Sequence, residues 1–597
     1  MARIKPPKWR QVPKVSLSSR DLTRRMKKVE TATVKHARRF VFKRWDNFRE
    51  VRSRIALWSL LIGILIGSTG LQFWWYQNEY RTQAAAQGGT YAEAVLGPLE
   101  TLNPIFAQSS AEEAASELLF SRLVTYDEKG TINYDLASSM KVGEDQKTYT
   151  VTIRPDARWS DGMYVRARDV VFTVNLIKNP ATRSTLTGWH DVKAVEIDDQ
   201  TVQFQLPAIY APFPHALRSL PILPEHILRN IEASQVRENN FSTKPVGTGP
   251  FTLRLLQGQD TASTQKIVHL VKNDSYYRGA PKLDRIQLHV YDTTDAILKA
   301  LSTSEVNAAS DLAVTEAARV NSNRYTVENN PVNSGVFAML NTSSPVLSDV
   351  NVRKALQVGT DTAAVRQAIS PNLPALHLPF TNDQVTGKVP GPPKYNQAEA
   401  TRLLDKAGWK IDGSTRKKDG VPLTLTLVTT KNPDFEKALE VLTKQWQELG
   451  ITVTTSIVDP NDVSQNVAQE ILRPRRFDVL LYQLTIGGDP DVYAYWHSSQ
   501  ASGGFNFANY RSGVSDDALS SARIRLEPDL RNAKYITFAK QWLSDAPGIG
   551  LYQSTAQYVH TDNVHNTVRD SVLNTAADRY HTVQYWGVGT MNVFKTP

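Results

Sequence analysis

The sequence contains no cysteine. This absence excludes disulfide bonds, metal sites built on thiolates, cysteine nucleophiles and a lipid attached to an N-terminal cysteine. Several catalytic motifs are also missing: there is no HExxH pair, no GxSxG turn, no phosphate-binding P-loop and no dinucleotide fingerprint. We therefore expect a protein that is not an enzyme and that needs no cofactor.

Metal-ligand patterns are weak as well. The eleven histidines are dispersed. His190 and His497 each follow a tryptophan and could touch a metal or haem, but isolated histidines of this kind more often have structural roles. Asp489 and Asp491 could form a carboxylate pair, although Pro490 between them favours a turn. The sequence predicts no metal site.

Charge is concentrated at the N-terminus. Residues 1–54 hold 18 Lys/Arg against 4 Asp/Glu, while the whole chain of 597 residues has a formal charge of +10. Apolar residues recur at helical spacing from Leu22 to Ile55, which predicts a basic amphipathic helix. Such a tail can lie on an anionic membrane surface or stay solvated. No helix-turn-helix or zinc motif accompanies it, so we expect no nucleic-acid partner.

Long hydrophobic runs are rare, and the exception lies at residues 55–76. These 22 residues carry no charge and are long enough to cross a bilayer core of about 30 Å. Trp74, Trp75 and Tyr76 form an aromatic belt at one end, and the basic flank precedes the run. We expect a single-pass anchor with residues 1–54 in the cytoplasm and the rest outside. The alternative is a cleaved signal peptide processed near Ala84–Ala86.

The remaining chain is organised around residues 244–253, KPVGTGPFTL. Gly247 and Gly249 supply the permissive positions of a tight turn. Phe251, Leu253 and Leu255 then alternate with polar residues, which predicts a half-buried strand. This stretch closes an excursion begun near residue 132, and we interpret it as the return of the chain to its first sheet.

Two patterns indicate the fold class. Tyr149, Val151 and Ile153 alternate with threonines, and a hairpin follows over residues 195–206, so this part is mainly antiparallel. Residues 423–427, 435–449 and 451–453 form a strand, helix and strand, for which parallel pairing is expected. The body is therefore predicted to be α/β.

Several motifs in this order resemble the family 5 extracellular solute-binding proteins, the peptide-, nickel- and oligosaccharide-capturing components of ABC importers. The resemblance covers roughly residues 89–560. It rests on WSDGMYVRARDVVFTV (159–174), LPEHIL (223–228), PVGTGPF (245–251), NDSYYRGAPKLD (273–284), DVNVRKAL (349–356), LLDKAGW (403–409), GDPD (488–491) and GFNFANY (504–510).

The resemblance implies a two-lobed, periplasmic-binding-protein-like fold with an extra inserted domain, preceded by one transmembrane helix. Ligand would bind between lobes that close by hinge motion. The expected division is a basic tail (1–54), a membrane helix (55–76), a linker (77–88), lobe I (89–131, 243–333 and 551–597), an inserted domain (132–242) and lobe II (334–550).

The candidate ligand site lies in an aromatic-rich segment. Residues 477–510 hold eight aromatics where the chain average of 9% predicts about three. In peptide-binding relatives the strand end here pairs with the ligand backbone. The resemblance therefore implies backbone contacts at Tyr482, Gln483 and Leu484, and the segment adds candidates that could line a pocket or merely pack around a loop. These are Ile486, Asp489, Asp491, Trp496, Phe505, Asn506 and Tyr510.

One position departs from the family pattern. Peptide-binding relatives often place an aspartate three residues before the acidic-proline pair to hold the ligand's ammonium, and here that position is Ile486. An apolar side chain cannot pair a buried charge. Either Asp489 or Asp491 takes over, or the ligand lacks a free amine at this place.

The resemblance implies a membrane-anchored, extracytoplasmic protein that captures peptides or peptide-like solutes. It would deliver them to two permease subunits of an ABC importer, with ATP hydrolysis in a separate subunit. Two alternatives remain open. One is a sensor that signals through the helix at 55–76, and the other is a binding protein for nickel, haem or a sugar.

Overall fold

The computed structural model describes residues 31, 34–35, 45–127, 130–258, 265–459, 466–567 and 571–594. The chain divides into two compact units, residues 1–84 with 592–597 and residues 85–591. The amphipathic helix predicted for the basic tail lies mostly outside the described residues.

The first unit contains helix α2 (Trp45–Tyr80). Within it, Val51–Tyr76 is long and apolar enough to cross a membrane by length and composition. The linker expected at residues 77–88 differs in the structure, because α2 continues to Tyr80 and β1 (Arg81–Ala85) follows, paired with β23 (Thr590–Phe594). No proline or glycine occurs at residues 77–87 to end the helix at the apolar boundary.

In the second unit, one ten-stranded sheet runs through the body. Its two longest strands, β13 and β20, pair antiparallel, and their register is interrupted between Pro331 and Gly335. This break separates the strands of one half of the sheet from those of the other. In spatial order the strands are β18 (Thr452–Val458), β17 (Thr424–Thr430), β19 (Val479–Thr485), β13 (Tyr325–Leu340), β20 (Gly548–Thr561), β12 (Ala308–Ala309), β2 (Thr90–Leu96), β11 (Arg285–Tyr291), β10 (Lys266–Lys272) and β9 (Phe251–Gln257).

The predicted strand–helix–strand unit is confirmed. β17 and β18 pair in parallel, and α12 (Pro433–Glu448) connects them. Trp446 on α12 is fully buried in the core that this helix forms with the sheet. The α/β character of this half therefore follows from a local pattern.

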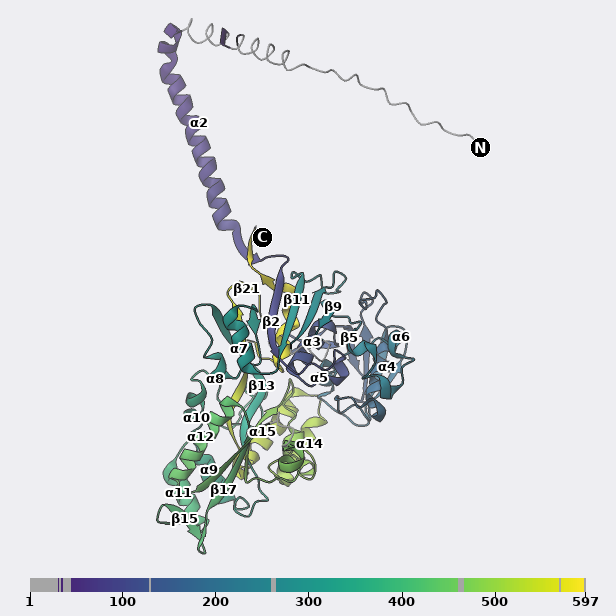
Figure 1. Cartoon of the computed structure of the whole chain (residues 1–597), viewed down its shortest axis with the longest axis vertical. Helices are drawn as coiled ribbons and strands as arrows, with labels where there is room; N and C mark the ends of the chain where they lie inside the picture. Colours follow the sequence, from purple (N-terminus) through teal and green to yellow (C-terminus); the bar gives the residue numbers. More distant parts are fainter. Residues whose placement is uncertain are drawn as a thin grey trace, which may run out of the picture. The chain divides into compact units, whose positions relative to one another are not determined.

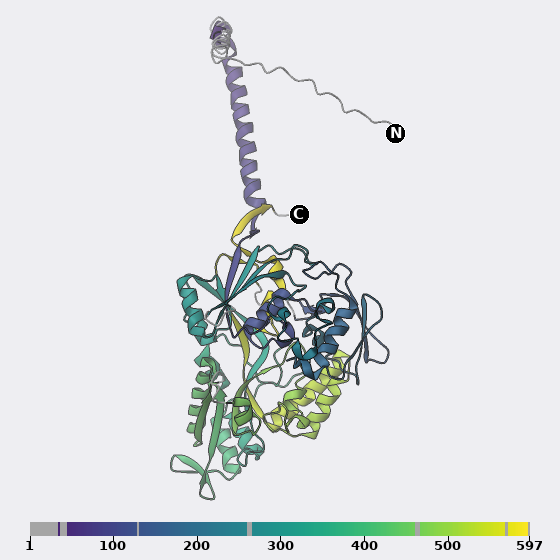
Figure 2. The same ribbon diagram turned by 45° about the vertical axis from the view of Figure 1, so that its right-hand side comes forward.

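Both faces of this half of the sheet are covered, as Figures 1 and 2 show. Alternate side chains of β13 point to opposite faces. Val336 and Ala338 join the core under α9 (Val350–Val358), α11 (Gln397–Lys406) and α12, whereas Phe337 and Met339 pack with α14 (Gly513–Arg523) and α15 (Pro528–Asp545). A strand buried on both faces reads as a continuous apolar run, which is what residues 336–340 show.

The stretch between residues 137 and 205 forms a separate antiparallel sheet. Its order is β5 (Ala137–Val142), β6 (Thr148–Ile153), β8 (Thr201–Gln205) and β7 (Lys193–Glu196), and the predicted β7–β8 hairpin is confirmed. Helix α4 (Ala167–Lys178) connects β6 to β7, and helices α5 (Phe213–Arg218) and α6 (Glu225–Leu228) follow β8. All three are drawn near β5 in Figure 1. The bounds given above to the lobes and the inserted domain stay a prediction.

The turn at residues 244–253 leads into β9, which joins the long sheet as expected. Its two central glycines serve a different purpose from the one predicted. Neither has a positive φ. A Cβ on Gly247 would lie 1.9 Å from the carbonyl oxygen of Leu119, and one on Gly249 would lie 2.5 Å from that of Leu118. These glycines are required because the turn packs directly on the backbone at the end of α3 (Ser110–Leu119).

The alternation predicted for β9 holds only for its first residues. Phe251 is buried, but Leu255 is 55% exposed. The pairing with β10 shifts register so that Arg254 has no opposite residue, which is a β-bulge. An extra residue reverses the faces of all later side chains, so Leu256 rather than Leu255 packs on the core.

Candidate functional site

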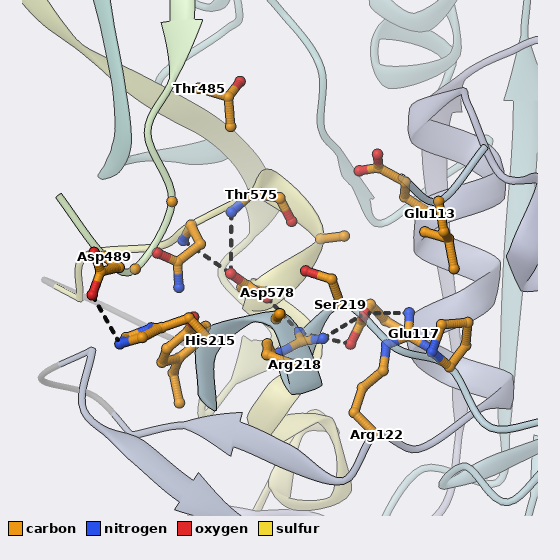
Figure 3. Close-up of a pocket in the computed structure, with 18 of the residues that line it drawn as sticks. Glu113, Glu117, Arg122, His215, Arg218, Ser219, Thr485, Asp489, Thr575 and Asp578 are labelled. Carbon is orange, nitrogen blue, oxygen red and sulfur yellow. Dashed lines mark hydrogen bonds and ion pairs between the residues drawn. The ribbon is translucent and has the colours of Figure 1, made fainter. Parts of the chain in front are cut away.

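A cavity of about 400 Å³ lies where four segments of the body meet. One wall is α3 and the segment after it, and a second is the region of α5. A third is the loop that follows β19, and the fourth is the start of helix η8 (Ala576–Tyr585). Figure 3 shows the charged side chains that these segments present. The acidic and basic side chains in the lining are those of Glu113, Glu117, Arg122, His215, Arg218, Asp489, Asp491 and Asp578.

The first wall is placed by a capping box. Ser109 caps α3 by accepting a hydrogen bond from the backbone of Glu112, and the Glu112 carboxylate accepts from the backbone of Ser109. Glu113 and Glu117 follow on the same helix, four residues apart, and therefore lie on one face. Both line the cavity.

Glu117 is held in an ion-pair network. Its carboxylate accepts hydrogen bonds from Arg122 at 2.9 Å and from Arg218 at 3.0 and 3.1 Å. Burial alone would raise the pKa of Glu117, but the two guanidinium groups outweigh it and hold the pKa below its usual range. Glu117 is therefore ionised and fully committed to its partners.

Helix η8 completes this network from the C-terminal part of the chain. Arg218 also pairs with Asp578, whose other carboxylate oxygen accepts from the backbone of Asn574 at 2.9 Å. The neighbouring Arg579 is buried and pairs with Glu93 of β2 at 2.6 Å. This buried pair fixes η8 on the sheet, and with it the position of Asp578.

The loop after β19 is tied to the register break of β13. The carbonyl oxygen of Asn333 accepts from the backbone of Ile486 at 2.9 Å and of Gly487 at 3.0 Å, while Gln384 donates to the carbonyl of Gly487. The Asn333 amide also donates to Asn574 at 2.9 Å. One residue at the break therefore positions two of the four walls.

Both aspartates of this loop are paired. Asp489 makes a two-point ion pair with Arg531 of α15 at 2.7 and 2.8 Å. Asp491 pairs with Arg523 of α14 at 2.9 Å and accepts from the hydroxyl of Tyr210 at 3.2 Å. Burial raises the pKa of Asp491, and the repulsion from Asp489 adds to this, while Arg523 opposes it.

The cavity is closed on one side by a contact that only glycine permits. A Cβ on Gly488 would lie 2.5 Å from the Tyr126 hydroxyl and 2.8 Å from Nδ1 of His215. Those two groups hydrogen-bond each other at 2.9 Å, and Nε2 of His215 lies 3.9 Å from Asp489. Burial lowers the pKa of His215, so this ring is neutral near pH 7.

Comparison with known proteins identifies the family of the chain that forms this site. Residues 131–506 match the model for the bacterial extracellular solute-binding proteins, family 5 (middle part). The chain belongs to this family. It is 26% identical over 519 residues to the oligopeptide-binding protein AppA of Bacillus subtilis, covering 84% of this chain and 92% of that protein.

Solved structures show the same fold. The oligopeptide-binding protein AppA of B. subtilis, in complex with a nonapeptide, superimposes with a TM-score of 0.67 at 24% identity over 85% of this chain and 100% of that one. NikZ of Campylobacter jejuni, in complex with Ni(L-His), gives a TM-score of 0.70 at 22% identity over 83% of this chain and 99% of that one. The two-lobed periplasmic-binding-protein-like fold expected from the sequence is confirmed.

As a family 5 binding protein, the chain places its predicted site residues in three settings. Ile486, Asp489 and Asp491 line the cavity. Tyr482, Gln483 and Leu484 lie on β19, paired to β13 on one side. On the other side β17 pairs with β19 only as far as Leu481, so within the described residues no strand covers the edge beyond it.

The remaining candidates lie away from the cavity lining. Trp496 is fully buried against Trp542 and Phe337. Asn506 is buried and bonds the backbone of Tyr510, whose hydroxyl donates to Asp545 at 2.7 Å. These side chains have internal packing and hydrogen-bonding partners, so their observed contacts are structural.

Phe505 is the exception among the aromatic candidates. Its side chain is 60% exposed, with its ring edge against Phe507. Like Trp496, Asn506 and Tyr510, it is predicted to bind ligand from the sequence, and that role stays a prediction.

The sequence reading missed most of the charged wall. Glu113 and Glu117 carry only the weak signal of two acids at helical spacing. Arg218 and Asp578 are 360 residues apart, and no local sequence pattern predicts that they interact. Among the residues that the structure describes, no group of three or more His, Asp or Glu side chains could hold a metal ion.

Proposed function

We propose that this protein is a membrane-anchored, extracytoplasmic solute-binding protein that captures peptides or peptide-like solutes and delivers them to an ABC importer. The observation that carries the proposal is the cavity lined by the loop after β19 and by the α3 wall, the segments that the predicted bounds assign to different lobes. Its volume falls within the usual range of small-molecule sites, roughly 300–1,000 Å³.

A peptide suits this site better than a compact solute for two reasons. Beyond Leu481 no described strand covers the edge of β19, so this edge could offer backbone hydrogen bonds to an extended chain, although the Thr485 carbonyl already accepts from the Tyr495 hydroxyl. In addition, AppA of B. subtilis, which matches this chain over 519 residues, is named an oligopeptide-binding protein.

Capture would proceed by closure of the lobes around the ligand. The register break at residues 331–335 supports a hinge in the strands that join the lobes. At the cavity lining, the Tyr210 hydroxyl donates to Asp491, and the backbone N–H of Ala211 donates to the carbonyl of Arg523 at 2.7 Å. These contacts would hold the closed form, which then docks on two permease subunits.

The apolar helix would anchor the protein. The run Val51–Tyr76 is exposed along its length in the structure, and the basic residues that precede it favour a cytoplasmic N-terminus. If the helix is instead a signal sequence, the mature protein begins after it. The cell fraction and mass of the protein distinguish the two, because cleavage near Ala84–Ala86 removes more than eighty residues and the anchor with them.

The full chain, purified in mild detergent without added ligand, tests the solute class. Bound compounds are released by denaturation and identified by mass spectrometry. A series of peptide masses is the expected result. A single non-peptide compound would remove peptides from the proposal and leave a solute-binding protein of another specificity.

A further inference from the structure

The charges that line the cavity do not balance. Its five carboxylates belong to Glu113, Glu117, Asp489, Asp491 and Asp578. Four guanidinium groups meet them, two in the lining and two from α14 and α15 behind it. The five carboxylates of the lining therefore outnumber by one the arginines that pair with them.

The surplus carboxylate can be identified from the pairing. Glu117 pairs with two arginines, Asp578 shares one of these, and each loop aspartate has its own. Within the described part of the chain, the carboxylate of Glu113 has no hydrogen-bond or ion-pair partner. Figure 3 shows it turned away from Arg122 and Arg218, with no interaction drawn to it.

The protein around Glu113 opposes its negative charge. Although the residue is exposed toward the cavity, the surrounding protein displaces part of the water around its carboxyl and raises the pKa to about 7, and repulsion by Glu117, Asp311 and Asp578 adds to the effect. Arg122 opposes the shift but is outweighed, since its guanidinium already donates to Glu117 and Ser116. The side chain nevertheless remains open to the cavity, where a cation could reach it.

We propose that Glu113 is the binding partner of the ligand's positive charge, and that this charge is the free N-terminal ammonium of a bound peptide. The inference rests on the proposed function of the cavity. It places the ammonium site on helix α3 of lobe I, although the family pattern described above would place it at position 486 in lobe II.

The loop of lobe II cannot supply this site in the observed arrangement. Position 486 is an isoleucine, and both aspartates that follow are engaged with Arg531 and Arg523. Freeing either one would leave a guanidinium without its carboxylate, which is most costly for Arg531, whose side chain is only 15% exposed. Glu113 can accept an ammonium without breaking any existing bond.

The test uses two libraries of random pentapeptides that lack Lys, Arg and His, one with free N-termini and the other N-acetylated. Wild-type full chain, emptied of ligand, is offered an equimolar mixture, and the retained peptides are counted by mass spectrometry. We expect the wild type to prefer free N-termini by about tenfold, because an acetylated end leaves the Glu113 carboxylate without a cation. In Glu113→Gln this ratio should fall to about one, while acetylated peptides are retained as before.

The control is Glu144→Gln, which removes an exposed glutamate outside the cavity lining and should leave the ratio unchanged. If the wild type retains peptides of both libraries equally, Glu113 is not the ammonium site, although peptide capture stands. If it retains none, the proposed function itself fails. Preference for free N-termini that survives in Glu113→Gln also overturns the inference.

A pH series on the wild type keeps the inference testable if the variant does not fold. Ionised Glu113 binds the ammonium and protonated Glu113 does not, so the preference for free N-termini should fall from pH 7.5 to pH 5.5. Among the neighbouring ionisable groups, burial raises the pKa of Asp311 and of Asp491, but Asp311 does not line the cavity and Asp491 is paired with Arg523. Glu117, Arg122, Arg218 and Asp578 are in ion pairs, Asp311 accepts from the backbone of Leu96, and His215 has a lowered pKa. A ratio independent of pH would contradict the inference.

Discussion

The two charged walls of the cavity are built by opposite means. On the lobe II loop, each aspartate is locked by an arginine of a helix behind it, Asp489 by Arg531 and Asp491 by Arg523. On helix α3, Glu117 is locked in the same way but Glu113 is not. Locked carboxylates stabilise the fold and offer little to a ligand, whereas a free one weakens the fold and can bind a cation. The difference separates structural charge from functional charge within one cavity.

The largest effect should come from breaking a lock on lobe II. Arg531→Met leaves Asp489 buried without a partner, and its side chain is only 7% exposed. We expect a loss of about 3 kcal/mol in the free energy of unfolding, measured by urea denaturation. Arg402→Met is the matched control, because its pair with Glu399 is on the surface, where water and salt screen it, and its loss should leave the free energy of unfolding nearly unchanged. Equal losses of unfolding free energy in the two variants would mean that the Arg531–Asp489 ion pair does not stabilise the fold.

The next effect concerns the contact between the walls. Gly488→Ala places a methyl group 2.5 Å from the Tyr126 hydroxyl, so either the loop or the Tyr126–His215 pair must move. Overpacking of this kind costs about 1–3 kcal/mol and should also weaken peptide retention. Gly513→Ala is the control, since nothing lies within 4 Å of its added methyl group. If Gly488→Ala retained peptides as well as the wild type, the close approach of Gly488 to Tyr126 and His215 would not be needed for peptide capture.

A smaller effect is expected at the hydrogen bond between Tyr210 and Asp491. Tyr210→Phe removes one hydrogen bond to Asp491 and leaves the Arg523 pair intact. We expect a loss of about 1 kcal/mol and a larger radius of gyration of the ligand-bound form by small-angle scattering. Tyr134→Phe, an exposed tyrosine on β4 (Ile132–Tyr134), should change neither quantity. An unchanged radius in Tyr210→Phe would exclude this contact as a latch.

The smallest effect has the opposite sign. The pKa of Glu113 is raised to about 7, so between its ordinary pKa of about 4.5 and pH 7 the folded protein holds a proton that the unfolded chain has released. Stability is therefore lost as pH rises through this window. Glu113→Gln should melt at a higher temperature than the wild type at pH 8, with a difference that disappears below about pH 4.5. A lower melting temperature at pH 8 would show that Glu113 has a stabilising partner.

Some features of the fold could be predicted from the sequence and others could not. The α/β class, the parallel β17–α12–β18 unit and the β7–β8 hairpin were predictable, because each depends on periodicity within about thirty residues. The first residues of β9 were predictable, but the bulge at Arg254 was not, since it depends on the pairing with β10. In the same way, Trp496 and Asn506 stand in an aromatic-rich segment, and only the packing shows that they are buried.

The sequence by itself determined the absence of thiol chemistry, the apolar run at residues 55–76 and the order of strands and helices, because composition and local spacing suffice for these. The tertiary structure alone decided which charges are free. Glu117 meets Arg218 at a separation of 101 residues, Arg218 meets Asp578 at 360, and Asp489 meets Arg531 at 42. An acid is available to a ligand only when no distant partner has reached it, and that depends on the folding of the whole chain.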